Sequence, residues 1–225
     1  RGITVLPVME KIIEYILKER TYKILEATQS HFQRGFTKHT SPLHASLIVE
    51  EVSRECKDKS SSSNFIMLDA KLAFDVVDHE HLLRRLYHSG VNDKHWTLIR
   101  SLHTTSSSVI KWQGKKSEPF PVFQCVKQGG IASTDFYKSY INPLLIRIEN
   151  TNLGAFIGNI NCSASGCADD VTINAADEVE TQVLINIAED FANSERYLLR
   201  PKKTEAIRFT AKRTQDTVDN FHLYN

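Results

Sequence analysis

The chain has 225 residues, of which 41% are hydrophobic and 24% are charged, and its net charge is +1. Such a chain can bury a full core, as one large domain or two small ones. It has no apolar run near the roughly 20 residues of a membrane span, and its four cysteines form no C-x-x-C pair. The cysteine pattern favours a reducing compartment and argues against a zinc site or a disulfide framework.

The first 63 residues predict two helices separated by a loop. Residues 3–18 combine a short lead with a helix that begins near Pro7. Residues 28–40 lack periodicity, and Ser41-Pro42 supplies an N-cap and a proline for a second helix, which ends near residue 58. Serines 60–63 are expected to be a connector. The first helix should bury Ile12, Ile13, Ile16 and Leu17 and expose Glu10, Lys11, Glu14 and Lys18.

The next 60 residues predict a strand, two helices and a hairpin. Residues 65–69 form a short apolar run that ends in a carboxylate, as a buried strand does. Asp78 and Asp93 are predicted to cap helices that end near residues 88 and 104. Residues 109–112 and 120–123 flank a Gly-Lys-Lys turn and indicate a hairpin. The histidines of the first of these helices are expected on its surface: His79, His81 and His88.

The remainder predicts helices at 134–149 and 179–191, short strands around 156–157 and 165–175, and a strand at 205–210. Gln128-Gly129-Gly130 is a flexible break before the first of these helices. Strands and helices do not alternate strictly, which favours an α+β fold with an antiparallel sheet over a doubly wound fold.

Two groups of carboxylates are candidates for chemistry. Asp169-Asp170 precede a short β-type run, Val171-Thr172-Ile173, and Asp69 ends another predicted strand. Each group alone could be a solvated turn or a strand-end cap. Brought together by antiparallel strands, the three carboxylates would repel one another in a low dielectric. A pair of Mg²⁺ or Mn²⁺ ions would relieve that repulsion, and two such ions about 4 Å apart serve in-line phosphoryl transfer.

Six motifs, in order, resemble those of reverse transcriptases, most closely those of non-LTR (LINE-type, jockey-like) retrotransposons. The stretch 65–75 resembles the first aspartate motif, D-x-x-x-A-F-D, and Cys167-Ala168-Asp169-Asp170 resembles the x-A-D-D box. The other four matches are residues 1–7 with R-P-I-x-L-L-P, 33–36 with Q-x-G-F, 128–133 with the Q-G motif, and 202–205 with K-T-E.

This resemblance implies a right-hand polymerase fingers–palm fold, with an antiparallel palm sheet packed on helices. It places the N-terminal part of the fingers at residues 1–62, palm at 63–80, a fingers/palm insertion at 81–125 and palm at 126–225. No endonuclease domain is expected before Arg1 and no complete thumb before Asn225.

The implied function is RNA-directed DNA polymerisation with two Mg²⁺ or Mn²⁺ ions. The partners would be an RNA template, a DNA primer and deoxynucleoside triphosphates, inside the cell at the nuclear insertion site, with no membrane. Asp69, Asp169 and Asp170 would be the catalytic carboxylates and, with the carbonyl of Ala70, the metal ligands. Nucleotide contacts would come from Arg1 and Lys203 at the phosphates, Phe74 as the gate that excludes a 2′-hydroxyl, and Gln128 and Gly129.

Three positions depart from the family pattern. Ser133-Thr134 stands where S-P is common, Cys167 replaces the usual aromatic residue, and Arg200 or a neighbour replaces an asparagine. Two alternatives therefore stay open at this point. One is a catalytically inactive reverse-transcriptase remnant that at most binds nucleic acid; the other is a different palm enzyme, such as a nucleotidyl cyclase.

Overall fold

The computed structural model describes residues 3–210, 221 and 223. Arg1, expected at the nucleotide phosphates, lies outside these residues. The chain forms two compact units, one of Arg1–Thr28 and Phe74–Tyr140 and the other of Gln29–Ala73 and Ile141–Asn225. Among the described helices, none combines the length and the apolar character that crossing a bilayer requires.

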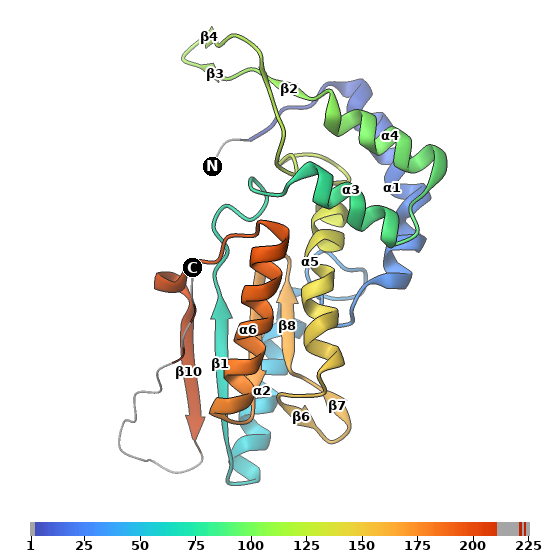
Figure 1. Ribbon diagram of the computed structural model, residues 1–225. Helices are drawn as coiled ribbons and strands as arrows, with labels where there is room; N and C mark the ends of the chain where they lie inside the picture. Colours follow the sequence, from blue (N-terminus) through green and yellow to red (C-terminus); the bar gives the residue numbers. More distant parts are fainter. Residues whose placement is uncertain (1–2, 211–220, 222, 224–225) are drawn as a thin grey trace. The chain divides into compact units, whose positions relative to one another are not determined.

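The second unit is built on a four-stranded antiparallel sheet (Figure 1), in the order β10-β1-β9-β8. The predicted α+β fold with an antiparallel sheet is thus confirmed. In the register, Phe65 on β1 lies between Ile207 on β10 and Asn174 on β9. The strands are β1 (Ser62–Leu68), β8 (Ala164–Cys167), β9 (Asp170–Ala175) and β10 (Glu205–Thr210).

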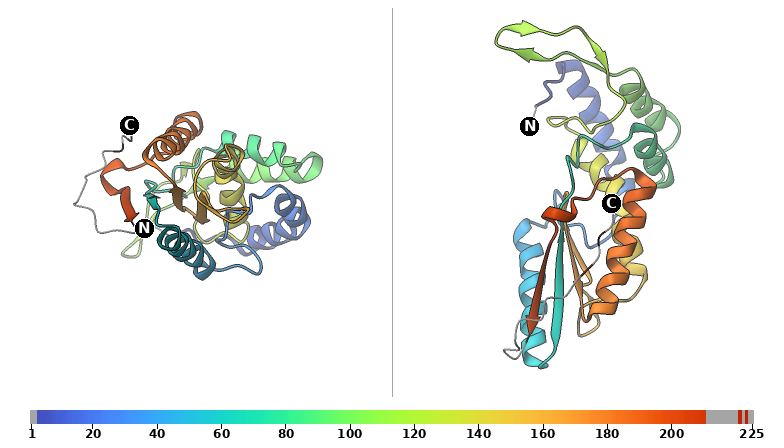
Figure 2. Two further views of the ribbon diagram at one scale, coloured as in Figure 1. Left: turned by 90° about the horizontal axis from the view of Figure 1, so that it is seen from below. Right: turned by 60° about the vertical axis from the view of Figure 1, so that its left-hand side comes forward.

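A helix covers each face of this sheet, α2 (Pro42–Asp58) on one side and α6 (Glu178–Glu195) on the other (Figures 1 and 2). Phe65 packs into a core cluster with Val52 of α2, whereas Ile66 and Leu68 lie beside Ile185 of α6. Because both faces are covered, β1 is apolar over consecutive residues instead of alternating. A small hairpin of β6 (Phe156–Ile157) and β7 (Ile160–Asn161) completes the unit.

The first unit is mainly helical and consists of α1 (Val8–Thr28), α3 (His79–His88), α4 (Asp93–Thr104) and the start of α5 (Ser133–Asn150). Asp78 caps α3 by accepting the backbone N–H groups of Glu80 and His81, as predicted. Between α4 and α5 the chain forms two short antiparallel pairs, β2–β5 and β3–β4. Their bounds are β2 (Ser107–Ser108), β3 (Lys111–Trp112), β4 (Lys115–Lys116) and β5 (Phe120–Pro121).

The first predicted helix was wrong in length and, except at Leu17, in its buried face. It continues ten residues past the predicted end at residue 18, to Thr28. Its buried side chains are Glu14, Leu17, Thr21 and Leu25, while Ile12 is 47% exposed. The apolar pattern predicted the wrong face because the Glu14 carboxylate accepts hydrogen bonds from the backbone N–H groups of residues 131 and 132. These bonds stabilise the carboxylate in its buried position.

Smaller predictions were also wrong at element ends. Serines 62 and 63 belong to β1 rather than to a connector, and Asn92 rather than Asp93 is the N-cap of α4. The hairpin turn is Gln113-Gly114, so the two following lysines lie in β4. His79 is buried, because the first turn of α3 packs on the chain before α5 and its Nε2 donates to the carbonyl of Cys125.

Candidate active site

The paired aspartates lie at a two-residue turn between β8 and β9. Cys167 and Asp170 are the last paired residues, so Ala168 and Asp169 form the turn itself. Ala168 has a φ of 61°, in the left-handed region that turns of this kind normally give to glycine. The turn presents the carboxylates of Asp169 and Asp170 at the end of the sheet, with Asp170 exposed and Asp169 half-buried.

Gln33, from the loop between α1 and α2, holds this turn in its unusual conformation. Its Oε1 accepts the backbone N–H groups of both Ala168 (3.0 Å) and Gly35 (2.9 Å), and its Nε2 donates to the carbonyl of Ala168 (3.3 Å). Backbone bonds continue the contact, from Arg34 N to Gly166 O and from Gly166 N to Phe32 O. The Gln33 side chain is buried, so its bonds are shielded from competition with water.

Gly35 is needed in this loop because the turn lies directly against it. A Cβ at position 35 would overlap the backbone nitrogen of Ala168 and would lie 2.7 Å from the carbonyl carbon of Cys167. The Q-x-G-F motif therefore has a physical role in this chain: the glutamine binds the turn, and the glycine lets the two backbones meet.

Asp69 reaches the same end of the sheet through the register of β1. Leu68, the last residue of β1, pairs with Val171 of β9, so Asp69 leaves the sheet at the same end where Asp170 begins β9. Two hydrogen bonds fix the Asp69 backbone, from its N–H to Thr204 Oγ1 and from Arg200 N–H to its carbonyl. The structure thus brings the two predicted carboxylate groups to one end of a single sheet.

A guanidinium group binds the oxygens of two predicted metal ligands. Arg200 Nη2 donates to Asp69 Oδ1 (2.8 Å) and to the carbonyl of Ala70 (3.3 Å), and Arg200 Nε contacts Asp69 Oδ2. The side chains of Arg200 and Asp69 are each 33% exposed. Arg200 stands three residues before Lys203, in the stretch where Arg200 or a neighbour replaces the asparagine expected from the resemblance. Sequence reasoning noticed this departure but missed its contact with Asp69.

The donor chemistry at this end of the sheet fits a hard divalent cation. Carboxylates and a backbone carbonyl are the ligands that such ions take, and a positive group, the Arg200 guanidinium, already binds Asp69 and Ala70. Burial, followed by the negative charges of Asp170 and Asp169, raises the pKa of the Cys167 thiol. Over residues 3–210, 221 and 223, however, no three His, Cys, Asp or Glu side chains form a ready-made metal cage.

Phe74 lies in the first unit, stacked on Tyr137 of α5. The ring centroids are 4.3 Å apart and the planes are 16° apart. Tyr137 is fully buried while Phe74 is half-buried, so the stack holds the Phe74 ring but does not enclose it. The backbone of Phe74 accepts the N–H of Val126, which places this ring beside the chain that leads into the Q-G motif.

The loop with Gln128 and Gly129 is held by the N-terminal part of the same unit. Thr4 N–H donates to the Gln128 carbonyl, and Gly129 has a φ of 113° and leaves no room for a Cβ beside the Thr4 carbonyl. Burial raises the pKa of Glu14, whose Oε2 accepts the N–H of Ile131 at 2.6 Å.

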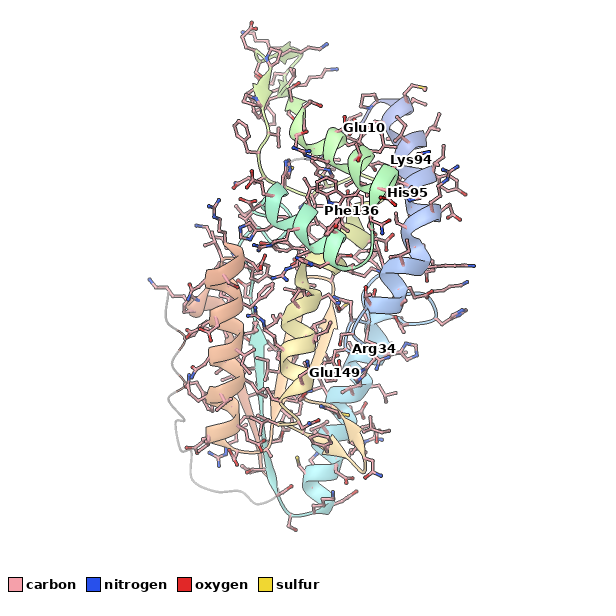
Figure 3. The ribbon with its side chains drawn as sticks, turned by 45° about the vertical axis from the view of Figure 1, so that its right-hand side comes forward. Glu10, Arg34, Lys94, His95, Phe136 and Glu149 are labelled. Atoms are coloured by element: carbon pink, nitrogen blue, oxygen red, sulfur yellow. The ribbon has the colours of Figure 1, made fainter. Side chains whose placement is uncertain are left out.

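An ion pair also supports the same loop from α1. Lys127 pairs at 2.6 Å with Glu10, which is labelled in Figure 3. Glu14 was not recognised as a support from the sequence, because its position on the helix predicted exposure; a buried acidic residue gives no local signal of this role.

The remaining predicted residues are placed as follows. Lys203 is exposed and ends the short 3₁₀ helix Pro201–Lys203, directly before β10. The second unit thus carries Asp69, Ala70, Asp169, Asp170 and Lys203, and the first carries Phe74, Gln128 and Gly129.

Comparisons with known proteins identify the class and then the family. The model of the family "Reverse transcriptase (RNA-dependent DNA polymerase)" matches residues 1–221. The chain is 22% identical over 213 residues to a Pol polyprotein from the type-1 retrotransposable element R2 of Popillia japonica, covering 94% of this chain and 30% of that protein. It is 27% identical over 159 residues to that of R2DM of Drosophila melanogaster, covering 71% of this chain and 15% of that protein.

A solved structure shares the fold. The apo telomerase of Candida tropicalis, truncated from its C-terminal domain, superposes with a TM-score of 0.65 at 12% identity, over 89% of this chain and 41% of that chain. The chain therefore shares with this telomerase an α+β fold that contains a small antiparallel sheet. The chain belongs to the reverse transcriptase family, and it spans 30% or less of the length of these two retrotransposon proteins. Because the chain belongs to the reverse transcriptase family, the alternative of a nucleotidyl cyclase is excluded.

Proposed function

We propose that this chain is the fingers–palm part of an RNA-directed DNA polymerase, which adds deoxynucleotides from their triphosphates to the 3′-hydroxyl of a DNA primer on an RNA template. The supporting observation is the strand register, which brings Asp69 to the sheet end that carries Asp170 and the Asp169 turn. The proposal takes residues 1–62 and 81–125 as fingers or insertion and 63–80 and 126–225 as palm. It places the activity in the nucleus, at the site of insertion.

In this proposal the carboxylates of Asp69, Asp169 and Asp170 and the carbonyl of Ala70 hold two Mg²⁺ or Mn²⁺ ions. When bound, the ions would lower the pKa of the attacking hydroxyl and would stabilise charge on the leaving pyrophosphate. The chain's part is to position these ligands, and the clamp of Gln33 on the Ala168 turn supports that role.

Other residues act on the nucleotide. Lys203 is exposed and ends a short helix, where its ammonium group is free to approach the pyrophosphate. Gln128 and Gly129 contact the nucleotide and template, and the lack of a Cβ at Gly129 permits close backbone approach. Arg1 is assigned to the triphosphate by its motif alone.

One observation favours the second candidate, an inactive remnant that at most binds nucleic acid. The Arg200 guanidinium holds Asp69 and Ala70, two of the proposed ligands. A cation must displace this pair before it can bind there. A partly exposed ion pair is worth about 1 kcal/mol or less, which is a small barrier beside the attraction between a divalent ion and several carboxylates. We therefore favour the active polymerase.

A primer-extension assay tests the proposal. The chain is given a DNA primer on an RNA template, deoxynucleoside triphosphates and Mg²⁺ or Mn²⁺. We expect extension by the parent chain and none by Asp69→Asn or Asp169→Asn, with both variants folded by circular dichroism. Extension by either variant at the parent rate contradicts the assignment. Template binding without extension, by the parent chain and by Arg200→Asn alike, supports the remnant.

A further inference from the structure

The β3–β4 hairpin has an exposed surface that the proposed chemistry does not use. Figures 1 and 2 show it projecting beyond helices α1, α3 and α4 of its own unit. Every residue from 109 to 121 is exposed. A two-stranded hairpin with neither face covered is marginally stable in water, so a ligand that binds it would also stabilise it.

The four paired residues of the hairpin are one tryptophan and three lysines. Trp112 is opposite Lys115 on one face, and Lys111 is opposite Lys116 on the other. The Trp112 side chain is 73% exposed, which is unusual for so large an apolar ring. Ile110, 60% exposed, points to the same face as Trp112 because the two are separated by one residue.

The charges of the hairpin favour an anionic ligand. No ion pair joins Lys111, Lys115 or Lys116 to another described residue. Like charges directly opposite in a sheet destabilise it, and the Lys111–Lys116 pair is of this kind. An anion bound between them removes the repulsion, and the nearest acidic residue in the sequence is the single Glu118.

We infer that this hairpin binds single-stranded nucleic acid, with Trp112 stacked on an unpaired base and Lys115 on a phosphate at the same face. Lys111 and Lys116 bind phosphates of the strand where it passes round the hairpin to the other face. Alternating aromatic and basic side chains are the usual means of binding single strands, since every base has a face for stacking. A duplex buries its base faces, so the exposed ring selects unpaired strands. This surface is separate from the carboxylates and needs no metal ion.

Fluorescence of Trp112 reports the contact directly. The chain has two tryptophans, and Trp96 is half-buried with its Nε1 bonded to the Leu83 carbonyl. In the Trp96→Phe variant, checked for folding by circular dichroism, the remaining emission comes from Trp112. We expect it to be quenched by deoxyribose and ribose oligonucleotides of about ten residues, and unaffected by a duplex of equal length. The titrations are made in EDTA without nucleotides.

Affinities measured by anisotropy of labelled oligonucleotides separate stacking from charge. Trp112→Ala should weaken binding roughly tenfold, within the range for loss of one stacked base. The triple variant Lys111→Gln, Lys115→Gln, Lys116→Gln should reduce the slope of log affinity against log salt by about 2, since each phosphate contact contributes roughly 0.7 for single strands. The matched control exchanges three exposed lysines elsewhere, Lys23, Lys57 and Lys94, for glutamine and should change the slope much less.

The inference is overturned if Trp112→Ala binds single strands as tightly as the parent chain, if the two triple variants behave alike, or if a duplex quenches Trp112 equally well. These outcomes are independent of polymerisation. A chain that binds strands through the hairpin but never extends a primer contradicts only the proposed function. A chain that extends a primer with unchanged binding by Trp112→Ala contradicts only this inference.

Discussion

At the scale of single residues, Arg200 is the group that most directly controls the proposed metal site. Its guanidinium binds the Asp69 carboxylate and the Ala70 carbonyl, and both contacts must break for a cation to enter. The resemblance to the family places an asparagine at position 200 or a neighbouring position, and asparagine carries no charge that competes with a cation. The contacts of Arg200 therefore predict weaker metal binding in this chain than an uncharged residue at position 200 would allow.

Replacing Arg200 by asparagine should tighten Mn²⁺ binding about fivefold, because a partly exposed ion pair is worth roughly 1 kcal/mol or less. Electron paramagnetic resonance of free Mn²⁺ measures the affinity without any turnover. Arg208→Asn is the matched control, since Arg208 pairs with Glu178 on β10 and α6. Equal affinity of the parent chain and Arg200→Asn would show that the guanidinium does not compete with the ion.

Phe74 is the residue that tests the sugar gate. Phe74→Val removes a ring that excludes a 2′-hydroxyl and cannot satisfy its hydrogen bonds, so ribonucleotide incorporation should rise relative to deoxyribonucleotide incorporation. The lost stack on Tyr137 should also cost about 1 kcal/mol of stability. The ratio of incorporation rates measures the first effect and the melting temperature the second.

Phe123→Val, at a side chain that is 76% exposed, is the control for general loss of an aromatic ring. If folded Phe74→Val enzyme discriminates against ribonucleotides as strongly as its parent, the ring is structural and the gate lies elsewhere.

At the scale of elements, the loop between α1 and α2 determines the shape of the β8–β9 turn. Gln33→Ala leaves the buried N–H groups of Ala168 and Gly35 without their acceptor, at about 1–3 kcal/mol for each unpaired group. We expect a loss of at least 2 kcal/mol in the free energy of unfolding, measured in urea, and lower Mn²⁺ affinity because the turn carries Asp169. Gln182→Ala, on the exposed side of α6, should change neither quantity.

Restoring part of the clamp provides a second test. Gln33→Glu keeps the acceptor for Ala168 N–H and Gly35 N–H but loses the donor to the Ala168 carbonyl. At neutral pH, Gln33→Glu should keep more of the parent chain's free energy of unfolding than Gln33→Ala does. A stability equal to that of the alanine variant would mean that the amide donor, rather than the acceptor, holds the turn.

At the scale of the whole molecule, two buried histidines predict how stability depends on pH. The rings of His79 and His103 lie 4.9 Å apart in the first unit, and His103 also contacts Phe136 of α5, which is labelled in Figure 3. Burial lowers the pKa of His103 to about 4, and burial also lowers the pKa of His79. The positive charge of Lys127 acts in the same direction on both rings.

Because the pKa of each of the two histidines is lower in the folded chain, the unfolded chain binds protons at a higher pH than the folded chain does. Stability is therefore full above the ordinary histidine pKa of 6.5 and falls as the pH drops toward 4. At pH 5, His103 alone should lower the free energy of unfolding by about 2 kcal/mol. This pH lies roughly 1.5 units below the pKa of histidine in the unfolded chain, and each unit corresponds to about 1.4 kcal/mol. Urea unfolding at pH 7.5 and 5.0 measures this loss.

His103→Asn should flatten the decline between these two pH values, while remaining less stable at pH 7.5 because the ring's packing is lost. His88→Asn, at an exposed ring that ends α3, is the control and should leave the decline as it is. A decline of unchanged size in His103→Asn would place its origin in other groups.

The sequence by itself determined the elements whose signals are local. Ser41-Pro42 and Asp78 begin helices through caps that involve neighbouring residues, and the strand at 205–210 has the bounds expected from its composition. The order of motifs was enough to expect a reverse transcriptase with Asp69 and Asp169 at strand ends. Helix caps and strand periodicity can be recognised from the sequence because each acts over a few neighbouring residues.

Only the tertiary structure decided which distant groups meet. Glu14, expected on a surface, is buried on backbone N–H groups of residues 131 and 132, and His79 is buried against residue 125. Gln33 binds the Ala168 turn, which lies 135 residues further along the chain, and Arg200 binds Asp69, which lies 131 residues earlier. Whether a polar side chain is exposed or buried depends on whether folding supplies partners for its hydrogen bonds, and those partners come from parts of the chain that local sequence patterns do not relate.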